Sequence, residues 1–268
     1  MTRTIRCLAA LAAAASLALA LGGCAAPPQD GGSASGIVTP SDETEARRRA
    51  RIRLELAVGY FEQGKTEIAL DEIKQVIAID PAFPDAHNMR GLIYMRLNDN
   101  RQAEESFRRA VALNPRDADV HHNLGWLLCQ QARYAEGQRS FDVAMANPLY
   151  PGRAKTLMAQ GVCQARAGMT GEAEQSLSRS YELDPTNPVT GFNLASLLYR
   201  RGENQRAQFY IRNLNNSEYA NAESLWLGIK VERRMNDMVA LRQLGEQLRK
   251  RFGGTREASA YERGSFDE

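Results

Sequence analysis

The sequence contains few of the residues from which active sites and metal centres are built. Its 268 residues include three histidines, His87, His121 and His122, and no cluster of Asp, Glu and His at metal-ligand spacing. It also lacks a glycine-rich phosphate loop and a nucleophile with a base at a recognisable spacing. His87 and His121 lie 34 residues apart, which favours a recurring packing role over a ligand role. We therefore expect neither an enzyme nor a protein that holds a metal or a cofactor.

Net charge and alternating β-branched runs are scarce as well. The chain has 34 Lys and Arg against 32 Asp and Glu, and two of the arginines lie in its first 23 residues, so the remainder is formally neutral. A neutral chain gives no sign of nucleic-acid binding, and a solvated helix end explains the basic cluster at residues 249–251. Because alanine and leucine are abundant and 25% of the residues are charged, the composition predicts a globular, all-α protein.

Long hydrophobic runs are confined to the amino terminus. Two arginines precede the apolar run Leu8–Leu21, which is short for a transmembrane helix of about 20 apolar residues and is typical of a signal peptide. Leu21-Gly22-Gly23-Cys24 then resembles a bacterial lipobox, which implies cleavage after residue 23 and acylation of Cys24, with palmitate among the acyl chains. The aspartate that retains lipoproteins at the inner membrane is absent, so the resemblance implies a lipid anchor on the periplasmic face of the outer membrane. The alternative is an ordinary signal peptide with a cysteine nearby.

Residues 24–46 are rich in Pro, Gly, Ser and Thr, and they are predicted to form a flexible tether. A tether of this composition would separate a lipid-modified Cys24 from the folded part of the chain.

Residues 84–115 contain a helix-turn-helix pattern. Gly91 would let two helices approach closely, Phe107 would fill the space between them, and Ala103 and Ala110 would keep the crossing tight. Pro115 cannot continue a helix and ends the unit. This pattern resembles a tetratricopeptide repeat.

The pattern recurs along the chain. Asp80-Pro81 precedes Asn114-Pro115 by 34 residues, which is the tetratricopeptide period, and Gly64 is predicted to take the left-handed conformation in the first turn. The next closing proline, Pro185, lies 70 residues after Pro115, which is two periods plus two. A two-residue insertion and a local irregularity are therefore predicted at Asn147–Pro151.

The resemblance to tetratricopeptide repeats implies a fold for residues 47–252. That fold is an all-α solenoid of about six helix-turn-helix repeats, wound into a right-handed superhelix. Residues 253–268 are predicted to be a frayed tail.

Two cysteines remain once the amino-terminal segment is excluded. Cys129 and Cys163 lie one repeat apart on the first helices of the third and fourth repeats. In an oxidising compartment such a pair usually bridges, and a bridge here would fix the irregular joint. It requires that both side chains face the joint, because bridged Cα atoms lie about 4.4–6.8 Å apart. The alternative is two buried free thiols.

A binding surface follows from the resemblance, because tetratricopeptide proteins present the first helix of each pair to a concave groove. Several groove positions are apolar without being needed for packing between helices, and such stripes usually mark partner sites for a peptide segment. The alternative is that neighbouring helices bury them. The residues that the family's groove positions match are Leu54, Val58, Phe61, Asn88, Leu92, Met95, Arg96, Asp119, His122, Trp126 and Gln130.

The lipobox, tether and six repeats together resemble one family over the whole chain, the type IV pilus biogenesis and stability lipoproteins of the PilF/PilW type. The resemblance implies a monomeric pilotin that binds the pilus secretin and helps it to reach the outer membrane or to form its multimer. The alternative is a periplasmic scaffold lipoprotein for another envelope protein, in cell-wall assembly or cytochrome maturation. The sequence leaves open which partner segment is bound, and whether the groove or the convex face binds it.

Overall fold

The computed structural model describes residues 43–266, which contain thirteen α-helices and no β-strand. Thr44 onward forms one compact unit. The predicted signal peptide, the lipidation site Cys24 and most of the predicted tether lie outside the described residues. The helices are α2 (Glu45–Glu62), α3 (Thr66–Ile79), α4 (Pro84–Arg96), α5 (Asn100–Leu113), α6 (Ala118–Gln130), α7 (Tyr134–Met145), α8 (Arg153–Arg166), α9 (Thr170–Leu183), α10 (Pro188–Arg200), α11 (Asn204–Asn215), α12 (Ala222–Arg234), α13 (Met238–Phe252) and α14 (Arg256–Arg263).

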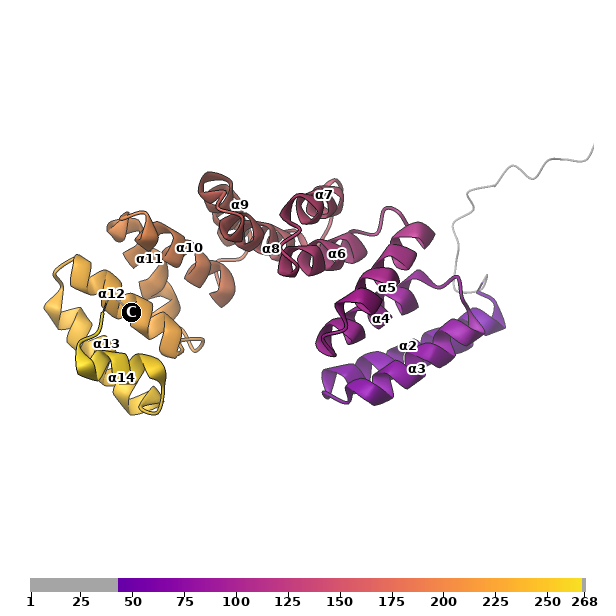
Figure 1. The fold of residues 1–268 in the computed structure, drawn as a ribbon, viewed down its shortest axis with the longest axis horizontal. Helices are drawn as coiled ribbons and strands as arrows, with labels where there is room; N and C mark the ends of the chain where they lie inside the picture. The colour runs from indigo at the N-terminus through magenta and orange to yellow at the C-terminus, as the bar shows by residue number, and fades with distance from the viewer. Residues whose placement is uncertain (1–42, 267–268) are drawn as a thin grey trace, which may run out of the picture. The chain divides into compact units, whose positions relative to one another are not determined.

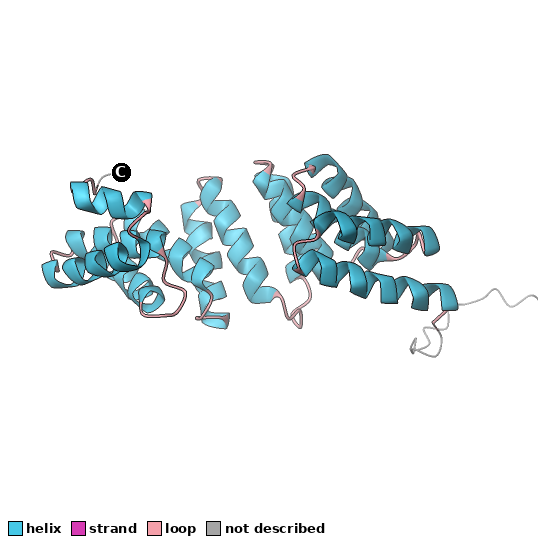
Figure 2. Cartoon of the chain, turned by 90° about the horizontal axis from the view of Figure 1, so that it is seen from below, coloured by secondary structure: helices cyan, strands magenta, loops and turns pink. Residues whose placement is uncertain are grey.

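The helices form six consecutive hairpins, followed by α14 (Figure 1 and Figure 2). We call α2, α4, α6, α8, α10 and α12 the first helices and their partners α3, α5, α7, α9, α11 and α13 the second helices. Each first helix packs against its own second helix, and each one from α4 onward also packs against the second helix of the preceding hairpin. It also touches the first helix before it. Each hairpin therefore contacts only its neighbours, as in a repeat protein.

The turn inside every hairpin places a residue in the left-handed conformation at the same position of the repeat. Gly64, which the sequence predicts in this role, has φ +75°. Gly has no Cβ to oppose this conformation, and Asn tolerates it better than most residues. The equivalent residues are Asn98, Ala132, Gly168, Gly202 and Asn236.

The predicted close approach of the two helices in a repeat is confirmed in the second hairpin. Phe107 of α5 is fully buried and its ring lies directly over Gly91 of α4, where a Cβ atom would overlap it. Leu177 takes the same place over Gly161 in the fourth hairpin. In the third hairpin, glycine also replaces the usual alanine of the second helix, and a Cβ on Gly137 would lie 2.9 Å from the carbonyl oxygen of Gly125.

The predicted irregularity lies between the third and fourth hairpins. The connection there runs over residues 146–152, whereas the connections at residues 80–83, 114–117 and 184–187 are shorter. Tyr150 of this connection is buried, with 6% of the residue exposed, and its hydroxyl donates a 2.7 Å hydrogen bond to Asp119. Arg153 donates to the carbonyl oxygens of Met145 and Asn147. The joint is longer than the others but has its own polar contacts.

The carboxyl-terminal segment differs from the prediction of a frayed tail. Residues 256–263 form α14, which packs on both α12 and α13 and buries Ala258 and Ala260. Tyr261 lies over Gly245, and Thr255 caps the helix by accepting from the backbone N–H of Ala258. This helix was missed because its apolar contacts come from two alanines and an aromatic residue in an otherwise polar segment.

Within residues 43–266, none of the helices is both long enough and apolar enough to cross a membrane.

Candidate protein-binding surface on the first helices

Side chains of successive first helices meet along one face of the compact unit. Asn123 of α6 donates a 3.0 Å hydrogen bond from Nδ2 to Oδ1 of Asn88 on α4. The guanidinium carbon of Arg96 on α4 lies 3.5 Å from the ring centroid of Phe61 on α2. These contacts join first helices without a second helix between them. We call the surface that they define the first-helix face.

The predicted apolar residues lie together at the amino-terminal end of this face. Leu54, Val58 and Phe61 of α2 and Leu92 of α4 are half-buried and pack against the same buried cluster. Met95 is half-buried too and packs with Leu92 on the cluster that contains Phe107. Part of each of these side chains therefore stays open to a partner.

The predicted polar residues differ in their exposure and in the contacts that they already make. Arg96 and Gln130 are exposed at the carboxyl-terminal ends of α4 and α6. Arg96 also donates to the carbonyl oxygen of Phe61, so its position over the Phe61 ring is fixed by two contacts. Asn88 is held by Asn123, and Asp119 accepts from the Tyr150 hydroxyl.

His122 differs from its predicted place on the binding surface. It is 5% exposed, and its Nδ1 shares a 2.9 Å hydrogen bond with Oγ1 of Thr156 on the next first helix, α8. Burial, aided by the positive charge of Lys155, lowers the pKa of His122 from its usual 6.5 to about 4. His122 therefore holds α6 to α8 as a neutral ring and presents little surface to a partner.

Trp126, one turn further along α6, remains half-buried and packs on two buried clusters. The guanidinium carbon of Arg166, from α8, lies 5.4 Å from the Trp126 ring centroid. One part of this large side chain thus belongs to the core and another part to the first-helix face.

The other two histidines have a structural role, as their spacing predicts. Nε2 of His87 lies 2.9 Å from the carbonyl oxygen of Pro81, and Nε2 of His121 lies 3.0 Å from that of Pro115. A carbonyl can only accept, so the proton is on Nε2 in both rings. Each ring therefore ties the start of a first helix to the proline that closed the preceding repeat.

The two cysteines stand at the joint between the third and fourth hairpins. The structure joins Cys129 of α6 to Cys163 of α8, with their Cα atoms 5.7 Å apart. Both residues are almost fully buried, beside Phe141 and Ala159. The bond links two first helices. The disulfide and the His122–Thr156 hydrogen bond therefore both connect the hairpins on either side of the longer joint.

Acidic side chains gather at the start of α4 and α6. Asp85, Asp117 and Asp119 lie close enough that burial and the negative charges of the other two raise the pKa of Asp85. Burial, followed by the hydrogen bond to Asp119 and the negative charge of Asp119, raises the pKa of Tyr150. The amino-terminal part of the first-helix face is therefore bordered by negative charge.

The fourth, fifth and sixth hairpins carry equivalent positions that the sequence analysis did not include. The repeat period was the available signal, because each position lies a fixed distance after one already named. Met158 and Phe192 are half-buried, Trp226 is 8% exposed, and Arg166, Arg200 and Arg234 are exposed. These residues extend the face through α8, α10 and α12.

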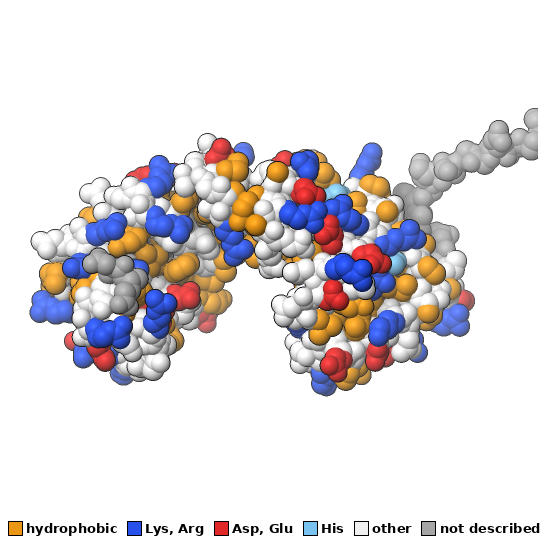
Figure 3. All heavy atoms as spheres, in the orientation of Figure 1, with side chains coloured by type: hydrophobic (Ala, Val, Ile, Leu, Met, Phe, Trp, Pro, Cys, Tyr) orange, Lys and Arg blue, Asp and Glu red, His pale blue; other side chains and the backbone are white. Residues whose placement is uncertain are grey.

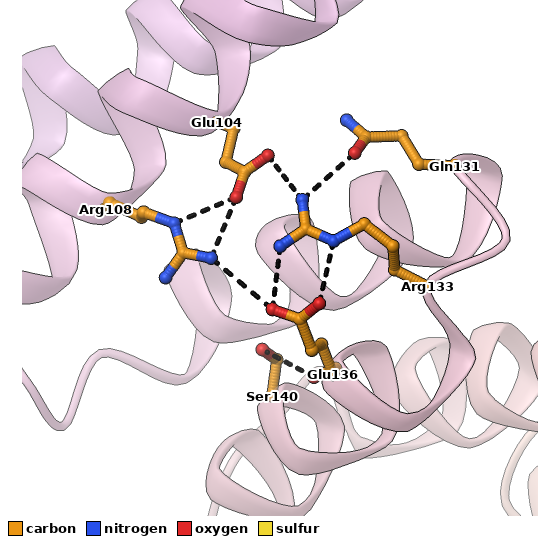
Figure 4. Close-up of polar contacts among 6 residues, drawn as sticks. All are labelled: Glu104, Arg108, Gln131, Arg133, Glu136 and Ser140. Carbon is orange, nitrogen blue, oxygen red and sulfur yellow. Dashed lines mark hydrogen bonds and ion pairs between the residues drawn. The ribbon is translucent and has the colours of Figure 1, made fainter.

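Several arginines on the second helices and in the turns are paired with acids. Figure 4 shows Glu104 between Arg108 and Arg133, with Glu136 completing the group. These hydrogen bonds and charges lower the pKa values of Glu104 and Glu136. Glu174 receives Arg201 and Arg206 in the same way two repeats later. Figure 3 shows Lys and Arg side chains next to Asp and Glu side chains on the face viewed there.

A separate hollow lies between α9, α10 and α11. Its volume is about 320 Å³, and Tyr181, Tyr210 and Tyr219 are among the residues that line it. Asn213 already donates a 3.1 Å hydrogen bond to the Tyr181 hydroxyl, and the Tyr181 and Tyr210 rings pack edge to face. The hollow has no group of charged side chains of one sign.

The described residues contain no group of three or more His, Cys, Asp or Glu side chains that could hold a metal ion. The first-helix face itself carries half-exposed apolar side chains, amides and guanidinium groups.

The fold and the repeat geometry are those of a tetratricopeptide-repeat solenoid. Tetratricopeptide-repeat family models match residues 59–98, 84–117 and 106–139. The predicted all-α tetratricopeptide fold is confirmed.

Relatives identify the family more narrowly. The chain is 28% identical to the type IV pilus assembly protein PilF of Pseudomonas aeruginosa, over 85% of this chain and 91% of PilF. The crystal structure of PilW, described as a widely conserved type IV pilus biogenesis factor, matches with a TM-score of 0.75 and 30% identity, over 80% of this chain and 98% of PilW. The solved structure of P. aeruginosa PilF matches with a TM-score of 0.75 and 26% identity, over 82% and 100%. The chain belongs to the PilF/PilW family of tetratricopeptide-repeat proteins of the type IV pilus.

Proposed function

We propose that this protein supports type IV pilus biogenesis as an outer-membrane lipoprotein that binds the pilus secretin and promotes its localisation or multimerisation. The observation that carries the proposal is the likeness to PilF and PilW over four-fifths of the chain, with no large part of either relative left unmatched. Function in this reading is binding rather than catalysis.

The first-helix face supports the proposal because it offers the kind of surface that a peptide segment of a partner can occupy. Phe61, Leu92 and Met95 are half-exposed on neighbouring first helices, and they are flanked by Arg96 and Gln130. An apolar strip with a polar margin is typical of helix-in-groove and extended-peptide recognition. A lipid on Cys24 would keep this face close to the membrane in which the secretin assembles.

The decisive experiment is a deletion strain assayed for secretin multimers in separated inner and outer membranes. The expected result is loss of the multimer, or its retention in the inner membrane, with restoration by the intact gene and not by a Cys24→Ala gene. Normal multimers in the outer membrane of the deletion strain would refute the proposal. They would favour a scaffold lipoprotein for another envelope assembly.

Surface variants test whether the first-helix face is the part that binds. Met95→Glu places a charge in the apolar strip and is expected to reduce secretin multimers in the complemented strain. Val143→Glu is the matched control, because Val143 is an exposed apolar residue on the second helix α7. Circular dichroism of both purified proteins establishes that they remain folded. Equal multimer levels in the two strains would exclude this end of the face as the binding surface.

A further inference from the structure

The last three first helices carry an arginine at the same position of the repeat. Arg166, Arg200 and Arg234 end α8, α10 and α12, and each follows the previous one by 34 residues. Arg96 and Gln130 occupy the same position in the second and third hairpins. All three arginines are exposed.

Contacts with the preceding first helix place two of these guanidinium groups on the first-helix face. The guanidinium carbon of Arg234 lies 3.9 Å from the ring centroid of Tyr199 on α10, and Arg234 donates a 3.0 Å hydrogen bond to the Tyr199 carbonyl oxygen. Arg166 lies over Trp126 of α6. Stacking holds these side chains in place, so less conformational entropy is lost when they bind a ligand.

These three arginines have no carboxylate partner within residues 43–266, and the Arg200 side chain has no hydrogen bond there either. This separates them from Arg133, Arg201 and others that pair with Glu104 and Glu174. The positions of α8, α10 and α12 that are equivalent to the groove positions of α4 and α6 include one acidic residue, Glu223. The carboxyl-terminal half of the face is therefore basic, whereas Asp85 and Asp119 border the other half.

A segment of the chain itself lies on this face at its carboxyl-terminal end. The Phe266 ring, just after α14, stacks on Trp226 of α12 with a centroid distance of 5.6 Å. The guanidinium carbon of Arg233 lies 4.4 Å from the Phe266 centroid. An aromatic side chain therefore fits between an aromatic ring and a guanidinium group on a first helix. Two acidic residues, Asp267 and Glu268, follow Phe266 in the sequence.

We propose that the first-helix face of the fourth to sixth hairpins binds an extended peptide segment of a partner protein that carries both acidic and aromatic residues. Its carboxylates pair with Arg166, Arg200 and Arg234, and its rings pack on the half-buried Met158, Phe192 and Tyr199. The inference rests on the proposed use of this face for protein binding and adds the chemistry of the partner. It concerns hairpins beyond those that carry the apolar strip around Phe61 and Met95.

The repeat geometry sets the spacing of the acidic residues in the segment. Neighbouring packed helices lie about 8–10 Å apart, and an extended chain in the polyproline II conformation advances about 3.1 Å per residue and returns to the same side every third residue. An acidic residue at every third position therefore meets successive arginines. A guanidinium group can take a carboxylate with two parallel hydrogen bonds, which favours Glu or Asp over an uncharged side chain.

The test uses the purified chain without residues 1–24, which lie outside the compact unit. The probe is a fluorescein-labelled peptide of repeated Glu-Ser-Phe triplets, and its control has Gln in place of Glu. The expected result is that the Gln peptide binds about tenfold more weakly, as three surface ion pairs together predict. Binding of the Glu peptide should weaken as salt is added.

Single substitutions locate the site. Arg166→Gln, Arg200→Gln and Arg234→Gln are each expected to weaken binding of the Glu peptide about two- to fivefold. Arg200→Gln is the sharpest of the three, because the Arg200 side chain makes no hydrogen bond or ion pair within the described residues that its loss could disturb. Arg179→Gln is the matched control, since it removes an exposed arginine from the second helix α9.

Three outcomes would overturn the proposal. The Glu and Gln peptides could bind equally, or the Arg200→Gln and Arg179→Gln proteins could bind the Glu peptide equally well. The third outcome is that the protein binds phosphatidylglycerol vesicles but not the peptide, and that Arg200→Gln weakens the vesicle binding. The basic face would then be a lipid contact. Failure here is separate from failure of the proposed function. The peptide assay uses purified protein, whereas the secretin assay uses cells that lack the whole chain.

Discussion

Single residues decide how closely the two helices of a hairpin approach, and Gly91 is the clearest case. Gly91→Ala is expected to lower the free energy of unfolding by about 1–3 kcal/mol, because the added Cβ overlaps the Phe107 ring. Gly59→Ala is the matched control in α2, where no atom lies within 4 Å of the added Cβ. It should raise stability by about 0.5–1 kcal/mol through helix propensity. Urea unfolding followed by circular dichroism measures both, and a gain in stability for Gly91→Ala would refute the packing argument.

His122 makes stability depend on pH. Its folded-state pKa of about 4 is below the value of about 6.5 in an unfolded chain. As the pH falls from 6.5 towards 4, the unfolded state therefore takes up a proton that the folded state does not, and stability falls by up to about 3 kcal/mol. Burial also lowers the pKa of His87, which acts in the same direction. The contribution is fully present above the unfolded pKa.

The variant His122→Gln isolates this effect. Between pH 7 and pH 5, above the ordinary pKa of 4.5 for glutamate, its urea midpoint should fall less than that of the parent protein. The Gln side chain can still bond to Thr156, so the comparison retains the contact between α6 and α8. Equal falls in the two proteins would show that His122 does not carry the pH dependence.

Residue roles inside one hairpin could be predicted from the sequence, and so could the Cys129–Cys163 pair between hairpins, whereas the role of His122 between hairpins could not. Gly91 and Phe107 are identified by their spacing, because both belong to one repeat with a fixed geometry. His122 occupies a groove position by the same spacing, but its burial depends on Thr156. Thr156 is placed by the longer connection at residues 146–152, whose path no period describes. The sequence therefore predicted where the irregularity lies and that a disulfide could hold it, but not that the longer connection would bury His122 against Thr156.

At the scale of helices, the bond between α6 and α8 is expected to stabilise the joint. A bridge that closes 34 residues contributes about 3–4 kcal/mol in the chain-entropy description. The Cys129→Ala, Cys163→Ala double variant should accordingly unfold at a lower urea concentration than the oxidised parent. The parent in reductant should move in the same direction. Identical midpoints, or two titratable thiols in the denatured unreduced protein, would contradict this prediction.

Helix existence was predictable where proline and glycine punctuate the chain, and the carboxyl-terminal helix was not. The pairs Asp80-Pro81, Asn114-Pro115 and Asp184-Pro185 mark hairpin ends directly. α14 begins with a Thr cap but has only Ala258, Ala260 and Tyr261 for apolar contacts, so its pattern is too weak to separate from a polar tail. Its stability comes from the surfaces of α12 and α13, which are available only once the sixth hairpin has folded.

For the whole molecule, contacts between neighbouring hairpins predict that a disturbance remains local. Removing residues 256–268 exposes the end of the sixth hairpin, including Trp226, which Phe266 covers. Amide exchange in α12 and α13 should then become faster by about tenfold or more, because local opening no longer has to displace α14. Exchange in α2–α5 should stay unchanged, since those helices do not contact α12, α13 or α14. A uniform increase along the chain would show instead that the six hairpins unfold together.

The placement of the disulfide has a consequence for the order in which the chain would fold if it is exported, as proposed above. The helices that pack most extensively on the two cysteine-bearing helices, α5, α7 and α9, all precede Asp184, and the contact of α8 with the later helix α10 is small by comparison. A chain that crosses a membrane from its amino terminus can therefore oxidise this pair while α10–α14 are still in transit. The earlier hairpins would then already be folded, and each later hairpin would fold against the one before it. The last helix, α14, would pack on α12 and α13 at the end.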